Sequence, residues 1–376
     1  MENRGRNVGV MNLIPRFSPS RVALSSIAAL LSLASVGCGP QNAGAPEAPG
    51  GQATPAPGSA SGSQVTLNAS GATFPAPLYQ RWFAEYNKLH PEVQVNYQGV
   101  GSGAGIKSFT DGLTDFGASD AAMSDKEIAE VKTGGVLLLP MTAGSIVISY
   151  NVPGVSQLQL PRDVYPDIFL GNIKAWNDPK IAAANPGVTL PDLPITVASR
   201  ADGSGTTYNF SGHLSAISAD FKSKIGQGKQ VKFPGVAGKG NDGVAALIKQ
   251  TPGTIGYIEY GYALQTKLPM ATLQNQAGKF VAPTPESGSE ALAQVPLPDN
   301  LRAFITDPAG ETSYPIVTYT WWLVHSEYAK PGVAAAIKAL ADWSLTDGQK
   351  LSAGLGYLPL PEAVVTKVQA AAAQIK

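Results

Sequence analysis

The stretch Arg200–Phe210, "RADGSGTTYNF", joins a predicted strand to a predicted helix and indicates both a fold class and a ligand site. The segment before it, "LPITVASR", is predicted to be a strand, and "YNFSGHLSAI" is predicted to begin a helix. Within eight residues the turn contains one cation, one anion, two glycines and three hydroxyl side chains. So many polar groups at one strand-to-helix turn raise the question of which ligand would need them.

Three further turns in the sequence have the same character. A helix N-terminus exposes unpaired backbone N–H groups and the positive end of the helix dipole. Small residues let an anion approach these N–H groups, and hydroxyl side chains add donors. Any one such turn alone is better explained as an ordinary helix cap. Four of them, together with Arg200 and Asp120, favour one oxyanion bound by several helix ends. The three turns are "SGATFPAP" with Ser70, Gly71 and Thr73, "GVGSGAG" with Ser102, and "GASDAAMSD" with Ser119 and Asp120.

Strands and helices alternate along most of the chain from Val65 onward, which predicts an α/β fold. "APLYQRWFAEYNKLH" is predicted to be an amphipathic helix, and "TIGYIEYGYA" and "YPIVTYTWWLVH" are predicted to be strands. "VLLLPMTAGSIVISYNVP" is predicted to form two strands with a break near Pro140–Gly144. The pattern of "PGVAAAIKALADWSLTDGQKLSAGLG" predicts a helix, a turn and a second helix.

The first 37 residues have the pattern of a secretory signal, with four arginines, one acidic residue and then an apolar run. The run Val22–Gly37 has 16 residues, which is short of the ~20 that a membrane span needs. It ends at Gly37-Cys38-Gly39, which resembles a bacterial lipoprotein cleavage site where the cysteine is lipidated. Ser35 departs from the leucine that such sites prefer three residues before the cysteine, so ordinary signal cleavage nearby is the alternative.

Composition limits the kinds of partner that we expect. Residues 38–63 are rich in Pro, Gly, Ala and Ser, which predicts a flexible linker. The formal net charge of the chain is zero, and removal of residues 1–37 leaves −3. This balance argues against a nucleic-acid or membrane-surface binder. Anion binding must therefore come from local geometry and not from overall charge.

The glycine-rich turn after Gly99 is not a nucleotide-binding loop, and we find no catalytic motif in the sequence. "GVGSGAG" does not fit G-x-G-x-x-G, and no GK[ST] follows it as a P-loop would require. His90, His213 and His325 are isolated, and neither H-E-x-x-H nor G-x-S-x-G occurs. The one cysteine, Cys38, excludes a multi-cysteine metal site. We therefore predict no catalytic residue, no metal site and no cofactor.

Six segments, in the same order, resemble the phosphate-binding protein of the bacterial phosphate ABC transporter. They are "GATFPAPLYQRW", "NYQGVGSGAG", "TDFGASDAAMSD", "RADGSGTTYNF", "GKGNDGVAALIKQTPGTIGYIEY" and "YPIVTYTWWLVH", and they cover roughly Val65 to the C-terminus. The resemblance implies an α/β, two-lobed periplasmic-binding-protein fold of type II, with the ligand in the cleft between lobes joined by a two-strand hinge. We expect lobe 1 at residues 65–141 and 316–376 and lobe 2 at residues 142–315.

The resemblance also implies which residues bind phosphate. They are Thr73, Phe74, Ser102, Asp120, Arg200, Asp202, Ser204, Gly205 and Thr206. Arg200 would bind the anion bidentately, and Asp202 would orient the Arg200 side chain. Asp120 would accept a proton from phosphate. The other residues would supply hydroxyl and backbone donors. Gly103 stands where a second serine is often seen, which removes a hydroxyl but no main ligand.

The function implied is high-affinity binding of inorganic phosphate outside the cytoplasmic membrane and its delivery to a permease driven by an ATPase, without catalysis. We expect a monomer in the periplasm or at the cell surface, anchored by lipid at Cys38. The alternatives are the same fold binding sulfate or molybdate, a secreted phosphatase, and an adhesin or structural surface protein. Asp120 argues against sulfate, because two opposed acceptors cost ~1–3 kcal/mol or more.

Overall fold

The computed structural model describes residues 64–132 and 134–376. The predicted signal at 1–37, the lipidation candidate Cys38 and the predicted linker at 38–63 lie outside the described residues. Along the part that is described, no helix is both long and apolar enough to cross a membrane.

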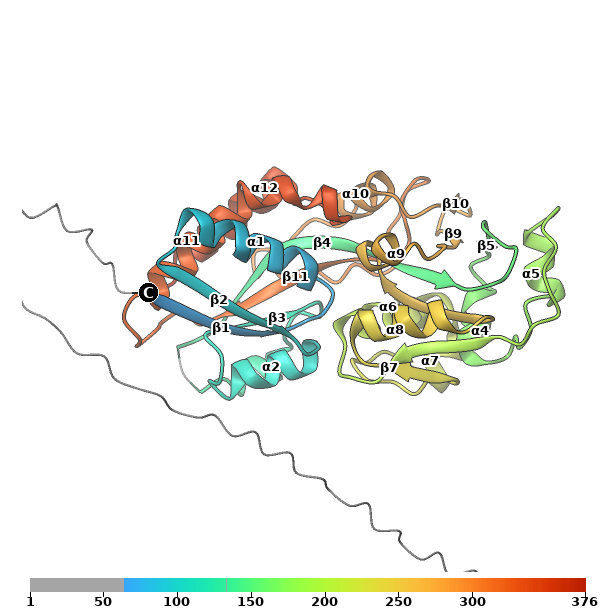
Figure 1. The fold of residues 1–376 in the computed structure, drawn as a ribbon, viewed down its shortest axis with the longest axis horizontal. Coiled ribbons are helices and arrows are strands. Elements are labelled where there is room, and N and C mark those ends of the chain that lie inside the picture. The colour runs from blue at the N-terminus through green and yellow to red at the C-terminus, as the bar shows by residue number, and fades with distance from the viewer. Residues whose placement is uncertain (1–63, 133) are drawn as a thin grey trace, which may run out of the picture. The chain divides into compact units, whose positions relative to one another are not determined.

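One mixed sheet of eight strands forms the centre of the fold (Figure 1). β1 runs parallel to β2 and β3, and β6 runs parallel to β7 and β8. β11 and β4 are antiparallel to each other and to their outer neighbours. The strand order is β2 (Val93–Gly99), β1 (Val65–Gly71), β3 (Phe116–Ser119), β11 (Val317–Val324), β4 (Leu137–Tyr150), β8 (Thr254–Glu259), β6 (Thr196–Arg200) and β7 (Val236–Gly238).

Strand β4 joins the two halves of this sheet. Its first part, Leu137–Ser145, pairs with β11, and its last part, Ile146–Tyr150, pairs with β8. The predicted break near Pro140–Gly144 is therefore wrong, because β4 is one strand of 14 residues. The register with β11 shifts between Thr320 and Trp321, so β4 has one extra residue beside Pro140. Such a bulge lets a proline, which has no N–H, stay inside a strand.

Five α-helices in the described part of the chain accompany the first half of the sheet, and α1 illustrates why they form. Leu78, Trp82, Phe83 and Tyr86 recur at helical spacing and are all buried, as the sequence pattern predicts. The predicted second helix after α11 is wrong: two short 3₁₀ helices, η1 (Gly348–Leu351) and η2 (Ala353–Leu355), follow instead. The five helices are α1 (Ala76–Leu89), α2 (Ser102–Thr110), α3 (Asp125–Ala129), α11 (Val333–Leu345) and α12 (Glu362–Ala372).

Among the described residues, the chain between β4 and β11 forms seven helices and a separate small sheet ordered β10 (Phe280–Val281), β9 (Thr272–Gln274) and β5 (Gln159–Leu160). The predicted strand "TIGYIEYGYA" ends at Glu259, because the Glu259 carboxylate accepts bonds from the Gly261 and Tyr262 N–H groups and begins a helix there. The helices are α4 (Tyr165–Leu170), α5 (Pro179–Ala184), α6 (Gly205–Ile217), α7 (Ala219–Lys224), α8 (Gly240–Gln250), α9 (Tyr260–Thr266) and α10 (Pro285–Ala293).

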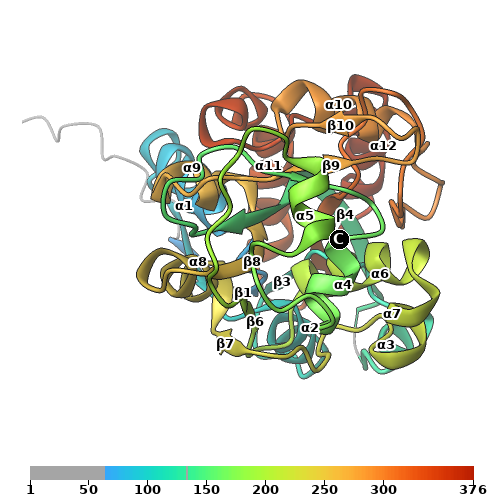
Figure 2. The ribbon, with the colours of Figure 1, turned by 90° about the vertical axis from the view of Figure 1, so that its right-hand side faces the viewer.

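The C-terminal helix α12 lies close to α10, as Figures 1 and 2 both show. Lys367 of α12 donates to the Leu297 carbonyl and to Asp299, just after α10. The described chain thus has the predicted α/β class, with two sheet halves that share β4 and are linked again through β11. This is the two-lobed arrangement that the resemblance implies.

Candidate anion-binding site

The donor-rich turns lie close to one another in the structure, and the start of α8 lies beside them. α1, α2 and α6 follow the carboxyl ends of β1, β2 and β6, and α8 follows β7. Parallel strands place their carboxyl ends at the same edge of a sheet, which is where ligands of open α/β folds bind. The two sheet halves meet there, since the Gly103 N–H donates to the Gly203 carbonyl over 2.8 Å. The structure brings all nine predicted site residues into this region.

Arg200, at the end of β6, is buried and has its guanidinium fixed by Asp202. The Arg200 Nε donates to Asp202 Oδ1 over 2.9 Å, and Nη2 donates to Asp202 Oδ2. Burial alone would raise the pKa of Asp202, but the hydrogen bond and charge of Arg200 hold it below its usual value. The pair leaves Nη1 directed toward Thr206 Oγ1, 3.4 Å away. Asp202 therefore orients the guanidinium and offsets its charge.

Asp120 follows β3 and is 1 % exposed. Its Oδ1 accepts a hydrogen bond of 2.9 Å from Thr320 Oγ1, and its Oδ2 lies 3.4 Å from Thr206 Oγ1. Burial raises the pKa of Asp120 to about 7, even though the Thr320 bond and the charge of Arg200 act to lower it. The carboxyl group is thus poised to share a proton near neutral pH.

The hydroxyl groups of the site have different partners. Ser102 Oγ accepts from the Asp120 N–H, and Ser204 Oγ accepts from the Thr207 N–H, which caps α6. Thr73 Oγ1 accepts from both the backbone and the side-chain nitrogen of Asn241. Each hydroxyl that accepts in this way keeps its own proton available for donation.

Gly205 is required where α6 approaches α2 and Asp120. A Cβ on Gly205 would lie 2.6 Å from Ser102 Oγ and 2.7 Å from Asp120 Cβ. The first N–H groups of α6 have no partner within the helix and begin at this glycine. The absence of a side chain therefore keeps these N–H groups accessible to an anion.

Gly103 stands where a second serine is often seen in the family that the sequence resembles. In the structure, this glycine lets the two sheet halves approach each other. A Cβ on Gly103 would lie 3.2 Å from the Gly203 Cα, which is tighter than ordinary contact. Two glycines facing each other allow the backbone hydrogen bond between them.

Two polar residues of the site were missed by the sequence analysis. Asn241, at the start of α8, is fully buried and bonded to Thr73, with its Nδ2 also 3.5 Å from Thr206 Oγ1. Thr320, on β11, is fully buried and bonded to Asp120. An asparagine at a predicted helix start is typical of a cap, so only the motif "GKGNDGV" could have drawn attention to Asn241.

Several further contacts, at the cluster and away from it, also join the two halves. Asn209 Nδ2 donates to the Asp120 carbonyl over 2.7 Å, and the Tyr262 hydroxyl donates to the Thr73 carbonyl over 2.6 Å. Lys229 forms an ion pair with Glu127. None of these bonds needs a ligand, so they belong to the arrangement of the chain itself.

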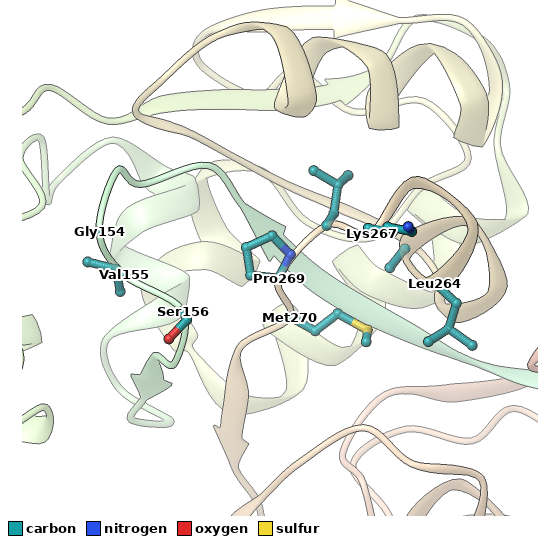
Figure 3. A pocket seen from close by; sticks show the side chains of 9 residues that line it. Gly154, Val155, Ser156, Leu264, Lys267, Pro269 and Met270 are labelled. Atoms are coloured by element: carbon teal, nitrogen blue, oxygen red, sulfur yellow. The ribbon is translucent and has the colours of Figure 1, made fainter.

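A surface hollow of about 600 Å³ lies elsewhere, between the segment after β4 and the end of α9 (Figure 3). Lys267 is the charged residue among those that line it, and Leu264, Pro269 and Met270 give it an apolar character. The C-terminal end of α9 borders the hollow, and helix C-termini disfavour anions. We therefore place the candidate site at the cluster around Asp120 and Arg200.

Comparisons with known proteins agree with this geometry. Residues 52–348 match the model of the PBP superfamily domain. The phosphate-binding protein PstS of Pasteurella multocida is 42 % identical over 310 residues, which cover 81 % of this chain and 89 % of that protein. PstS of Methanocaldococcus jannaschii is 41 % identical over 328 residues, covering 80 % and 84 %. A high-affinity periplasmic phosphate-binding protein solved with phosphate superposes with a TM-score of 0.67 at 21 % identity, covering 81 % of this chain and 93 % of that one.

The fold and the superfamily match define a substrate-binding protein with the two-lobed periplasmic-binding-protein fold. The extent and identity of the sequence matches are more specific. The chain belongs to the PstS family of phosphate-binding proteins.

Proposed function

We propose that this protein binds inorganic phosphate between its lobes and delivers it to the permease of an ABC importer, without catalysing a reaction. The observation that carries the proposal is a buried carboxyl group, Asp120, beside a buried, oriented guanidinium, Arg200, and hydroxyl donors. Phosphate near neutral pH both carries a proton to donate and offers oxygens to accept. A fully ionised anion such as sulfate has no proton for Asp120.

The proposed ligand set is the one implied by the sequence. Thr73 and Thr206 donate by hydroxyl, and Phe74 and Gly205 donate by backbone N–H at helix starts. Ser102 adds its hydroxyl and its backbone N–H, and Ser204 adds its hydroxyl, because each side chain accepts a hydrogen bond and keeps its own proton. The backbone N–H of Ser204 is bonded to the Lys229 carbonyl. Arg200 donates from the side of its guanidinium that is not bonded to Asp202.

We further propose that residues 65–141 and 316–376 form one lobe and residues 142–315 the other, and that the lobes close on the ligand. β4 and β11 supply the connections about which such a motion would turn. The proposal is supported by the direct bonds between halves, such as that from Gly103 to Gly203.

Calorimetry with phosphate, arsenate and sulfate tests the binding proposal. We expect one saturating site for phosphate, similar binding of arsenate, which has the same shape and protonation, and much weaker binding of sulfate. Solution scattering should show compaction on addition of phosphate. Steady hydrolysis of a phosphate ester by the pure protein would favour a phosphatase and overturn the proposal.

We also propose that the mature protein is a monomer in the periplasm or at the cell surface, anchored to a membrane by lipid at Cys38. The support is the basic head, the short apolar run and the Gly37-Cys38-Gly39 site. Cys38→Ser should move the protein from the membrane fraction to the soluble fraction. A wild-type protein that is already soluble would contradict the anchor and leave phosphate binding unaffected.

A further inference from the structure

Asn241 connects the two halves of the site through a fixed set of hydrogen bonds. Its side chain is fully buried at the start of α8. The Oδ1 atom accepts from the Glu259 backbone N–H over 3.0 Å. A backbone N–H is always a donor, so this bond determines which end of the amide faces Glu259. The Nδ2 end must therefore face the threonines.

The hydroxyl of Thr73 receives two donors from Asn241. The Asn241 backbone N–H lies 3.2 Å from Thr73 Oγ1, and Nδ2 lies 3.0 Å from it. A hydroxyl oxygen has two lone pairs and one proton. With both lone pairs occupied, and with neither nitrogen able to accept, the Thr73 proton must point away from Asn241.

The hydroxyl of Thr206 also faces two donors, but at longer distances. Its Oγ1 lies 3.5 Å from Asn241 Nδ2 and 3.4 Å from Arg200 Nη1, and both of these are donors. The acceptor within reach is Asp120 Oδ2, 3.4 Å away. Asn241 thus contacts one proposed ligand hydroxyl from each lobe.

We propose that Asn241 is a positioning residue that makes Thr73 a dedicated hydrogen-bond donor to the bound anion. The inference rests on the proposed function and adds a residue to it that does not itself touch phosphate. Pre-orientation of a hydroxyl matters because a rotating hydroxyl would lose freedom on binding, and a hydroxyl turned the other way would oppose its lone pair to the anion.

A double-mutant cycle between Asn241 and Thr73, measured by phosphate titration, tests the inference. Thr73→Val removes the hydroxyl but keeps the shape. We expect Asn241→Ala to weaken phosphate binding about tenfold when Thr73 is present, and by less than about twofold in the Thr73→Val background. A purely structural role of Asn241 would weaken both backgrounds equally, and this result would overturn the inference.

Asn241→Asp gives a second arm that preserves the shape and the bond to Glu259. Its second oxygen accepts the Thr73 proton and withdraws it from the anion. The added charge also repels phosphate, but it does so equally in the Thr73→Val background, so the difference between backgrounds isolates the hydroxyl. We expect this difference to be at least about tenfold, and equal losses in the two backgrounds would contradict the proposal.

Two controls separate the possible failures. Thr73→Ser keeps the hydroxyl and should keep the sensitivity to Asn241→Ala. A wild-type protein that binds no phosphate would refute the proposed function itself. A wild-type protein that binds phosphate tightly, with no coupling between Asn241 and Thr73, would refute only the inference made here.

Discussion

Asp120 combines an acidic side chain, almost complete burial and a position beside Arg200, and the proposed selectivity of the site depends on it. The hydrogen bond from Thr320 fixes one carboxyl oxygen and leaves the other toward Thr206. A carboxyl group of this kind distinguishes a protonated anion from a fully ionised one by what it can accept. The pH at which Asp120 loses its proton and the preference of the site for phosphate over sulfate should therefore both depend on this carboxyl group.

Asp120→Asn should change selectivity more than affinity for phosphate. The amide can turn its N–H toward an ionised oxygen, so the opposition to sulfate is removed and sulfate affinity should rise by roughly 10- to 100-fold. Arg200→Ala should weaken both anions, because it removes charge without regard to protonation. Paired phosphate and sulfate titrations of both variants and the parent measure this. An unchanged phosphate-to-sulfate ratio in Asp120→Asn would mean that Asp120 does not sense the proton.

The raised pKa of Asp120 also predicts how the stability of the ligand-free protein depends on pH. The folded chain holds the Asp120 proton more tightly than the unfolded chain, whose carboxyl group has the ordinary pKa of 3.8. Its favourable contribution is present below that value and is lost as the pH rises through about 7. Above pH 8, Asp120→Asn should therefore stabilise the ligand-free protein by on the order of 4 kcal/mol. Urea unfolding at pH 5 and pH 8 tests this, and an equal gain at both values would exclude a titration effect.

At the scale of elements, the start of α6 is closely packed against the opposite half of the sheet. Its first residue, Gly205, lies against Ser102 of α2 and against Asp120, which follows β3. Ser204 caps the same helix, and its backbone N–H donates to the Lys229 carbonyl. The helix start is thus fixed on one side by its own lobe and on the other by the opposite one.

Gly205→Ala should abolish tight phosphate binding without unfolding the protein. The new methyl group would meet Ser102 Oγ at 2.6 Å and Asp120 N at 2.8 Å, both from the opposite half, while alanine itself favours the helix. We expect at least a 100-fold loss of affinity, or about 2.7 kcal/mol, and an unchanged or higher melting temperature. Gly212→Ala, later on α6, is the matched control, because its methyl group meets the flexible Gln227 side chain. A similar loss in both variants would indicate damage to the helix instead.

At the scale of the whole molecule, the described halves are joined by bonds of two kinds. Some surround the site, such as those of Asn241 and Tyr262 with Thr73. Others lie away from it, such as the ion pairs of Lys229 with Glu127 and of Arg302 with Asp125. In the closure that we propose, the second kind would stabilise the closed form whether or not an anion is present.

Lys229→Met should speed phosphate release to a small extent. It removes a partly exposed ion pair between the lobes while keeping most of the apolar stem, and such pairs contribute no more than about 1 kcal/mol. We expect the dissociation rate to rise about two- to fivefold, with the effect shrinking at high salt. Stopped-flow measurement at two salt concentrations tests this, with the exposed Lys232→Met as the control. A salt-independent change would exclude the ion pair as its cause.

Much of the fold and site could be predicted from sequence because the signals are local. The strand, turn and helix around Arg200 follow one another within about twenty residues. The strand, turn and helix around Thr73, and those around Ser102, are similarly close in sequence. The continuity of β4 could not be predicted, because the bulge beside Pro140 depends on pairing with the distant β11. Asn241 was missed for the same reason, since its partner Thr73 is 168 residues away.

The backbone bond between Gly103 and Gly203 has a consequence for energy use in transport. We propose that the permease accepts the closed form of the protein and that this contact triggers ATP hydrolysis by its ATPase. Every bond that forms on closure without phosphate raises the population of closed, empty protein and so the rate of ATP hydrolysis without cargo. Two facing glycines keep this contact to a single hydrogen bond with no side-chain packing. We therefore expect changes that strengthen it to raise phosphate affinity and, at the same time, to lower the number of phosphate ions moved per ATP.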